Sequence, residues 1–207
     1  EIIDLPGCHS ISQIDIGAPY DEQITATYVL QNHIDYIINV VDIARLESSL
    51  YLTTQLLETN IPMLIVISKK DLAKKLAVHI DIKLLASKLK APVMTLDITE
   101  NNDIIELSHY LKTNIKAQKN QTNNTLLTQC SIVKDAVNQV AAHIKHNNYI
   151  NKESIALNML AGATIIKHDC QKLQQAISHA AANITKYYNT ETDIAIAQNR
   201  YNFIKQA

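Results

Sequence analysis

An aspartate and a glycine near the start of the chain have the spacing of a loop that binds a nucleoside triphosphate. Asp4 and Gly7 follow two isoleucines in the order Asp-x-x-Gly. At the end of a strand, an Asp carboxylate holds the water shell of Mg²⁺, and a Gly amide, with no side chain beside it, approaches the γ-phosphate closely. The same residues also form plain strand exits. The pair alone therefore predicts only a candidate site for phosphate and Mg²⁺.

A second candidate loop, Ser68-Lys69-Lys70-Asp71, follows the apolar run 61–67. Its order is similar to the Asn-Lys-x-Asp loop of GTPases, in which the Asp accepts two hydrogen bonds from guanine and the Lys stem covers the base. The alternative is a strand exit with solvated charges. Because open α/β sheets bind ligands at the carboxyl ends of strands, the two loops support each other.

The first half of the chain has the pattern of a parallel sheet with crossover helices, since short apolar runs alternate with helical periodicity. Strands are expected at 1–4, 36–42, 62–67 and 92–96, and helices at 46–57, 82–89 and 104–115. We therefore expect a mostly parallel α/β domain at 1–118. A polar stretch at 119–124 follows it and is expected to be a linker.

Beyond the linker, apolar residues recur only at intervals of three and four, which is typical of amphipathic helices. Four helices are expected, at 126–144, 155–166, 173–184 and 194–204. Short connections between them predict an all-α four-helix bundle at 125–207.

Composition limits the class of protein. The chain has 207 residues, of which 47% are hydrophobic and 19% charged, and a net charge of −1, as is typical of a soluble protein. Its three cysteines form no CxxC pair, so neither a disulfide framework nor a zinc finger is predicted, and a reducing compartment is favoured. Without a concentrated basic stripe, a nucleic-acid partner is not expected.

Three longer strings carry a resemblance to a known family. They are Asp4-Leu5-Pro6-Gly7, the string IINVVD-x3-LExxLYLT-x-QLLE at 37–58, and Arg200-Tyr201-x-Phe203-Ile204 near the end. With them, the chain resembles the cytosolic amino-terminal region of the FeoB family of bacterial ferrous iron transporters. The resemblance implies a P-loop, small-G-protein-like domain, then a helical regulatory domain that favours GDP retention, and a membrane iron permease downstream.

The resemblance also implies the ligands and their residues. GTP or GDP would bind with Mg²⁺, which Asp4 would hold through water, and K⁺ is a further candidate cofactor. A third loop, Asp97-Ile98-Thr99, would present a backbone amide to the guanine O6; the alternatives are that its Asp repels the base oxygen or caps the following helix. The nucleotide-binding residues expected on this basis are Asp4, Gly7, Ser68, Lys69, Asp71, Asp97 and Ile98.

The chain departs from the family's pattern at three points. Cys8 stands where many GTPases carry a water-orienting Gln, so no catalytic residue is assigned and hydrolysis is expected to be slow. Ser68 replaces the expected Asn, which predicts weaker base binding. No GxxxxGK[ST] phosphate loop occurs in the 207 residues. In the family, the strand carrying it lies between those at 1–4 and 36–42, so we expect an upstream segment; a domain inactivated by truncation is the alternative.

The implied role is regulation of Fe²⁺ uptake at the cytoplasmic face of the bacterial inner membrane. Implied partners are the permease of the same polypeptide, small cytosolic Feo proteins and a second copy of the chain. A tRNA-modification or ribosome-assembly GTPase and a nucleotide-free scaffold remain alternatives. Candidate ligands for iron itself are His143, His146, His168 and Cys170, although surface histidines are common on helical bundles.

Overall fold

The computed structural model describes residues 1–12, 19–69, 80–97, 99–115, 130–144, 151–163 and 170–206. These residues belong to two compact units. One unit consists of Ile34–Asn123 with Ile204–Ala207, and the other of Glu1–His33 with Asn124–Phe203. The first 33 residues therefore group with the helical part of the chain. The domain boundaries at 118 and 125 stay predictions.

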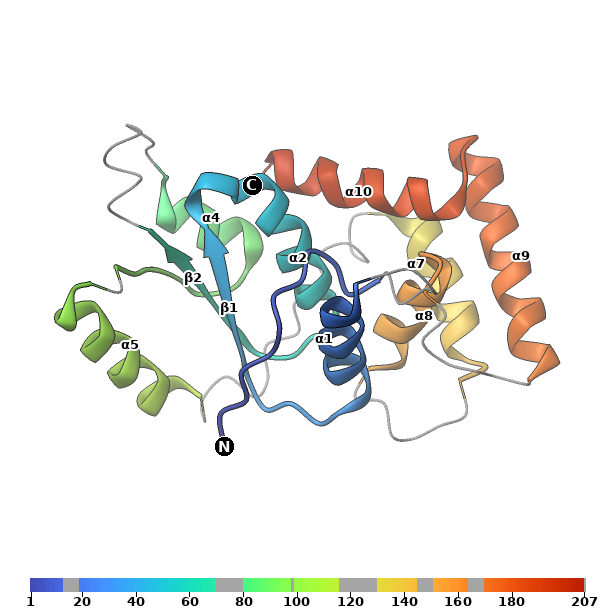
Figure 1. Cartoon of the computed structure of the whole chain (residues 1–207). Helices are drawn as coiled ribbons and strands as arrows, with labels where there is room; N and C mark the ends of the chain where they lie inside the picture. Colours follow the sequence, from blue (N-terminus) through green and yellow to red (C-terminus); the bar gives the residue numbers. More distant parts are fainter. Residues whose placement is uncertain are drawn as a thin grey trace. The chain divides into compact units, whose positions relative to one another are not determined.

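The first unit contains a parallel sheet with strand order β1-β2-β3 (Figure 1). Its strands are β1 (Ile37–Asp42), β2 (Met63–Ser68) and β3 (Val93–Thr95). Their positions confirm the strands predicted at 36–42, 62–67 and 92–96. The register pairs Ile37 with Met63 and Asp42 with Ser68, so β1 and β2 end at the same level.

Helices cover both faces of β2, the central strand, of which Met63 to Ile67 are buried. On one face, Leu64, Val66 and Leu96 pack against α5 (Asn101–Asn114). On the other, α2 (Leu46–Glu58) contacts β1. The short helix η1 (Ile43–Arg45) follows β1, and α4 (Ile82–Leu89) contacts β3. The three predicted helices of this half are confirmed.

A buried side-chain hydrogen bond joins β1 to α2. The Asn39 amide Nδ2 donates to Thr53 Oγ1 at 2.8 Å, and the same hydroxyl donates to the Ser49 carbonyl at 2.9 Å. Asn39 is 6% exposed and Thr53 is fully buried. Because buried amides are costly without partners, this bond satisfies a polar group that a strand of IINVVD sequence brings into the core.

The strand predicted at 1–4 is wrong. Residues 1–8 have no regular secondary structure, and the Ile2 side chain is 90% exposed. A strand needs a neighbour to satisfy its backbone groups, and in the described residues β1 pairs only with β2. Instead, the Pro6 carbonyl accepts a hydrogen bond of 2.7 Å from the Thr25 hydroxyl of α1 (Tyr20–Gln31).

The four helices predicted beyond the linker are confirmed, and all of their described residues before Ile204 belong to the second unit. These helices are α7 (Ser131–Ala141), α8 (Lys152–Leu160), α9 (Gln171–Tyr188) and α10 (Thr192–Gln206). Residues 126–129 and 164–166 of the predicted helices lie outside the described residues. Helices α7, α8 and α9 pack against one another through apolar side chains such as Val137, Leu157 and Ile184. Among the residues in the ranges given above, no helix combines the length and the apolar content needed to cross a bilayer. The predicted linker lies outside the described residues.

The same unit buries a cation. Arg200 on α10 is 1% exposed, and its Nη1 donates to Ser12 Oγ at 3.3 Å. The Ser12 hydroxyl in turn donates to Asn158 Oδ1 on α8 at 2.8 Å. Because a buried guanidinium is tolerated only when its donors are satisfied, these polar contacts specify how residues 10–12 lie against α8 and α10.

Removing the Thr53 hydroxyl should destabilise the first unit. Thr53→Val keeps the side-chain shape but leaves the Asn39 amide buried without this acceptor, which costs about 1–3 kcal/mol in the free energy of unfolding. Thr54→Val is the matched control, because the Thr54 hydroxyl is equally buried but bonds only within its own helix, to the Tyr51 carbonyl. Urea unfolding measures both. Equal losses for the two variants would contradict the importance of the bond between β1 and α2.

Candidate functional site

The carboxyl ends of the three strands meet at one edge of the sheet. Asp42, the last residue of β1, is paired with Ser68, the last residue of β2. The Leu96 amide, just after β3, donates to the Ile67 carbonyl at 2.8 Å. The carboxyl ends of β2 and β3 therefore lie side by side. This is the edge at which open parallel sheets bind ligands.

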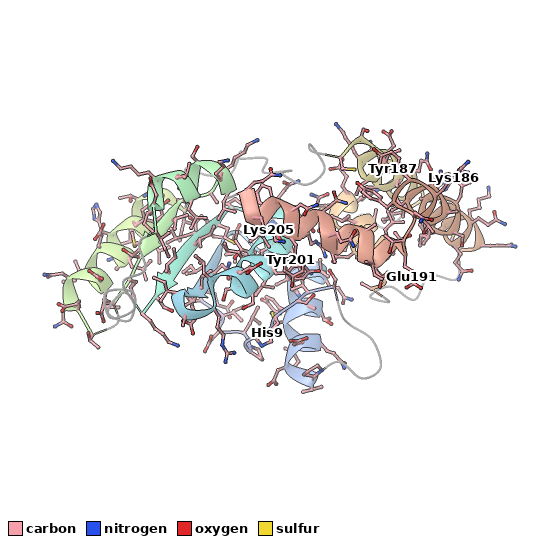
Figure 2. The ribbon with its side chains drawn as sticks, turned by 90° about the horizontal axis from the view of Figure 1, so that it is seen from above. His9, Lys186, Tyr187, Glu191, Tyr201 and Lys205 are labelled. Carbon is pink, nitrogen blue, oxygen red and sulfur yellow. The ribbon has the colours of Figure 1, made fainter. Side chains whose placement is uncertain are left out.

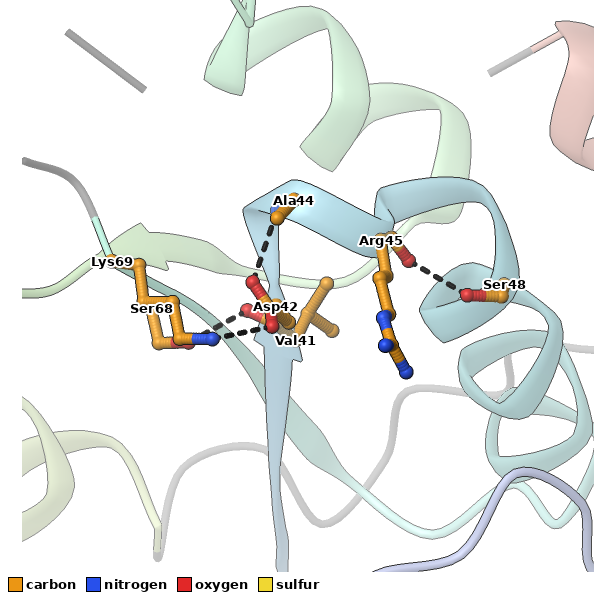
Figure 3. A network of polar contacts seen from close by, with 7 residues as sticks. All are labelled: Val41, Asp42, Ala44, Arg45, Ser48, Ser68 and Lys69. Atoms are coloured by element: carbon orange, nitrogen blue, oxygen red, sulfur yellow. Dashed lines mark hydrogen bonds and ion pairs between the residues drawn. The ribbon is translucent and has the colours of Figure 1, made fainter. Parts of the chain in front are cut away.

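Two side chains at the end of β2, those of Ser68 and of Lys69 just after it, bond to the end of β1, as Figure 3 shows. Ser68 Oγ donates to the Val41 carbonyl at 3.1 Å. Lys69 Nζ donates to Asp42 Oδ2 at 2.6 Å. The other carboxylate oxygen, Asp42 Oδ1, accepts a hydrogen bond of 3.0 Å from the Ala44 amide and thereby caps η1. Ser68 and Lys69 are thus hydrogen-bonded to the end of the neighbouring strand, β1.

The pair of Lys69 and Asp42 is accessible to a ligand. The side chains are 56% and 30% exposed, respectively. The hydrogen bond from Lys69 lowers the pKa of the Asp42 carboxyl, and the bond from the Ala44 amide lowers it further. Asp42 is therefore ionised at neutral pH. Lys69 has φ of 61°, in the left-handed region that side chains other than glycine rarely adopt.

Asp97 is the first residue of the predicted third loop, and the structure describes it. Its carboxylate forms a tight local turn. Its Oδ1 accepts from the Thr99 amide at 3.0 Å and from the Thr99 hydroxyl at 2.6 Å. Its own amide donates to Asp103 Oδ2 in α5 at 2.8 Å. The carboxylate therefore shapes the turn before α5 but does not cap that helix, whose N-cap residue is Glu100. Asp71 and Ile98 lie outside the described residues.

The Asp-x-x-Gly residues belong to the other unit. Asp4 and Gly7 are both exposed, and a Cβ at Gly7 would meet no atom within 4 Å. Among the described residues, close packing does not explain this glycine, and the space beside it would admit the close approach of a ligand. After them, the His9 amide donates to the Glu22 carboxylate of α1 at 3.1 Å.

The thiol of Cys8, in the position usual for a water-orienting Gln, is half-buried. Burial, together with the nearby Glu22 carboxylate, raises the pKa of Cys8 to about 11. At neutral pH the group is a protonated thiol, which is neither a useful base nor a strong nucleophile.

Sequence reasoning did not count Asp42 among the site residues. The signal was present, because Asp42 ends an apolar strand just as Ser68 does. What the sequence lacked was the pairing of β1 with β2, which brings the Asp42 carboxylate to Lys69.

Other candidates lie in the helical unit. An open groove between α7 and α9 is lined by Asp135, Gln139, Asn183, Lys186, Tyr187 and two apolar residues of α7. Figure 2 labels Lys186 and Tyr187 on α9. The groove contains none of the residues predicted to bind nucleotide. Within the described ranges, no three His, Cys, Asp or Glu side chains gather as metal ligands, and His146 and His168 lie outside those ranges.

Comparisons with known proteins match both halves of the chain. The family described as ferrous iron transport protein B matches residues 1–111, and the FeoB cytosolic helical domain matches residues 130–207. The Fe(2+) transporter FeoB of Salmonella typhimurium is 39% identical over 124 residues, which cover 53% of this chain and 16% of that protein. The Escherichia coli (strain K12) transporter of the same name is 37% identical with the same coverage.

Solved structures agree in fold. An S. thermophilus NFeoB mutant bound to GMPPNP has a TM-score of 0.85 at 21% identity, covering 98% of this chain and 78% of that one. The cytosolic domain of the T. maritima FeoB iron transporter in GDP form II has a TM-score of 0.74 at 22% identity, covering 98% and 76%. The resemblance and the fold class are thus confirmed. The first of the two family matches spans more than half of the residues of this chain. The chain therefore belongs to the ferrous iron transport protein B family, FeoB.

Proposed function

We propose that this chain is a guanine-nucleotide-binding region that hydrolyses GTP slowly and regulates Fe²⁺ passage through a membrane permease of the same polypeptide. The observation that carries the proposal is the meeting of Asp42, Ser68 and Lys69 at the carboxyl edge of a parallel sheet in a FeoB chain. The chain spans 16% of the curated relatives it matches, so the permease belongs to the proposal.

The proposed roles follow from the chemistry of the side chains. Asp71 would accept the N1 and N2 hydrogens of guanine, and the Lys69 stem would cover the base. Gly7 would approach the γ-phosphate. Bound nucleotide supplies the anhydride that is hydrolysed, and the loop residues bind and orient it.

Support for guanine nucleotides and for K⁺ comes from the relatives. The S. thermophilus structures include one described as bound to GDP.AlF4- and K+. For Mg²⁺, the exposed Asp4 carboxylate is the hard oxygen ligand that this ion prefers, and it would act through the ion's water shell. The phosphate loop that such a site needs is not among the 207 residues.

A second candidate, a nucleotide-free scaffold, is favoured by one observation. The hydroxyl of Ser68, which replaces the Asn of the guanine loop, already donates to the Val41 carbonyl. A hydroxyl has a single hydrogen to donate, so it cannot also replace the amide donors of an Asn. This candidate predicts no preference for guanine over adenine, whereas the GTPase proposal predicts a weak but definite one.

Restoring the amide should strengthen nucleotide binding. In the full-length protein, Ser68→Asn is expected to tighten GDP about fivefold, the equivalent of one neutral hydrogen bond of about 1 kcal/mol. Ser48→Asn is the matched control, because Ser48 is an exposed serine of the same unit that bonds only to the Arg45 carbonyl. A fluorescent GDP titration measures both. No tightening with Ser68→Asn would remove Ser68 from the base site.

Changing the base preference should change which nucleotide drives iron transport. Asp71→Asn replaces a carboxylate acceptor with an amide that suits the extra carbonyl of xanthine, so it should exchange a GTP requirement for an XTP requirement. Uptake of ⁵⁵Fe²⁺ into vesicles containing the full-length protein measures this, with the unchanged protein as control. Uptake that stays GTP-dependent in the variant would place Asp71 outside the base site, and uptake indifferent to every nucleotide would refute the regulatory role.

Cys8 should be dispensable for hydrolysis and slow to react. Because burial holds the pKa of the thiol at about 11 rather than 9.0, the thiolate fraction near pH 7.5 is about 100-fold smaller than in unfolded protein. Alkylation by iodoacetamide, followed by mass spectrometry, should be slower to a similar degree and should still accelerate above pH 9. Cys8→Ser should keep GTP turnover within about twofold. A large loss of turnover with Cys8→Ser would make Cys8 a catalytic residue after all.

A further inference from the structure

The backbone of Lys69, the first residue after β2, needs an external constraint. Lys69 adopts φ of 61°, where its Cβ crowds the backbone, and nothing intrinsic to lysine favours that conformation. A backbone of this kind persists when surrounding contacts determine it, and ligand sites are where such residues concentrate. Here the strained residue is the first one after the strand.

The contacts that hold Lys69 in this conformation come from the end of β1. Ser68 Oγ bonds to the Val41 carbonyl, and Lys69 Nζ bonds to Asp42 Oδ2. The Asp42 carboxylate cannot turn freely, because its second oxygen accepts from the Ala44 amide of η1. The fixed Asp42 carboxylate at the end of β1 therefore holds the flexible Lys69 side chain by its ammonium group (Figure 3).

The lysine remains available while it is held. With 56% of the side chain exposed, its stem is accessible, and the ammonium group keeps two further hydrogens that can be donated. A lysine has many rotamers, and ordering it before a ligand arrives removes part of the entropy lost on binding.

We propose that Asp42 is a positioning residue for base recognition, which orders Lys69 for the guanine base. The inference rests on the proposed function and adds a residue to it. Because the pair is exposed to solvent, the expected effect is a modest one of about two- to fivefold in affinity.

The test uses GDP binding to the full-length protein. Asp42→Asn removes the charge but keeps an oxygen for the Ala44 amide, so the cap of η1 is retained. This variant should weaken GDP about two- to fivefold, mainly through faster release, and Asp42→Glu should bind more tightly than Asp42→Asn. Asp81→Asn is the matched control, because Asp81 caps α4 through the Leu84 amide in the same unit, and it should bind GDP normally.

A double-mutant cycle separates positioning from a general structural role. In a Lys69→Met background, Asp42→Asn should have no further effect on GDP, since there is no ammonium group left to position. The effect of Asp42→Asn alone should also shrink in 1 M salt, where exposed charges are screened. Equal losses in the two backgrounds, or a loss that salt does not change, would overturn the inference.

The outcomes also distinguish this inference from the function on which it rests. Normal GDP binding by Asp42→Asn, or tighter binding, would overturn the positioning role and leave the proposed function in place. No GDP binding by the unchanged protein would overturn the proposed function, and the positioning role with it.

Discussion

The register between β1 and β2 is the constraint on which the candidate site depends. It places Asp42 opposite Ser68, so that the carboxylate, the hydroxyl and the Lys69 ammonium group lie at one edge of the sheet. A slip of one residue would turn Asp42 to the opposite face and expose the alternate residues Asn39 and Val41. The burial pattern of β1 fixes the register, because Asn39 and Val41 are buried whereas Ile38 and Val40 are exposed, and the buried Asn39 amide bonds to Thr53.

Stability and positioning come from different interactions. The buried strand supplies the stability: full burial of a single aliphatic side chain contributes about 1.5–3 kcal/mol, and Leu64, Ile65 and Ile67 are each no more than 1% exposed. The exposed pair of Lys69 and Asp42 contributes about 1 kcal/mol at most. Its consequence is therefore the position of the Lys69 side chain, and the unit would remain folded without the pair.

Sequence patterns predicted most of the secondary structure, because local composition decides it. The run 63–67 is apolar throughout and continues into a polar loop, so both the buried strand and its end are visible in the sequence. The segment Glu1-Ile2-Ile3-Asp4 has the same local character, yet it is not a strand, since strand formation depends on a partner that the segment itself cannot specify. Asp42 escaped notice for a similar reason: its contact with Lys69 joins residues 27 positions apart.

The helical residues show a comparable limit. The periodicity at 173–184 predicts α9, but no pattern in the sequence predicts that Arg200 lies in the core beside Ser12, 188 positions away. From sequence alone, a charged residue is expected at the surface. A guanidinium group is buried only where several polar partners converge on it. In both units, the structure thus adds long-range polar contacts that the sequence pattern does not predict.

The central claim, that guanine nucleotides bind at the carboxyl ends of these strands, is tested most directly by nuclear magnetic resonance of the full-length or cytosolic FeoB protein. Backbone amide shifts would be followed during titration with GDP and, separately, with ADP. The account predicts that GDP shifts the amides of Ser68, Lys69 and Asp97, at concentrations where ADP leaves them unchanged. Equal shifts with both nucleotides, or GDP-induced shifts confined to the groove between α7 and α9, would contradict it.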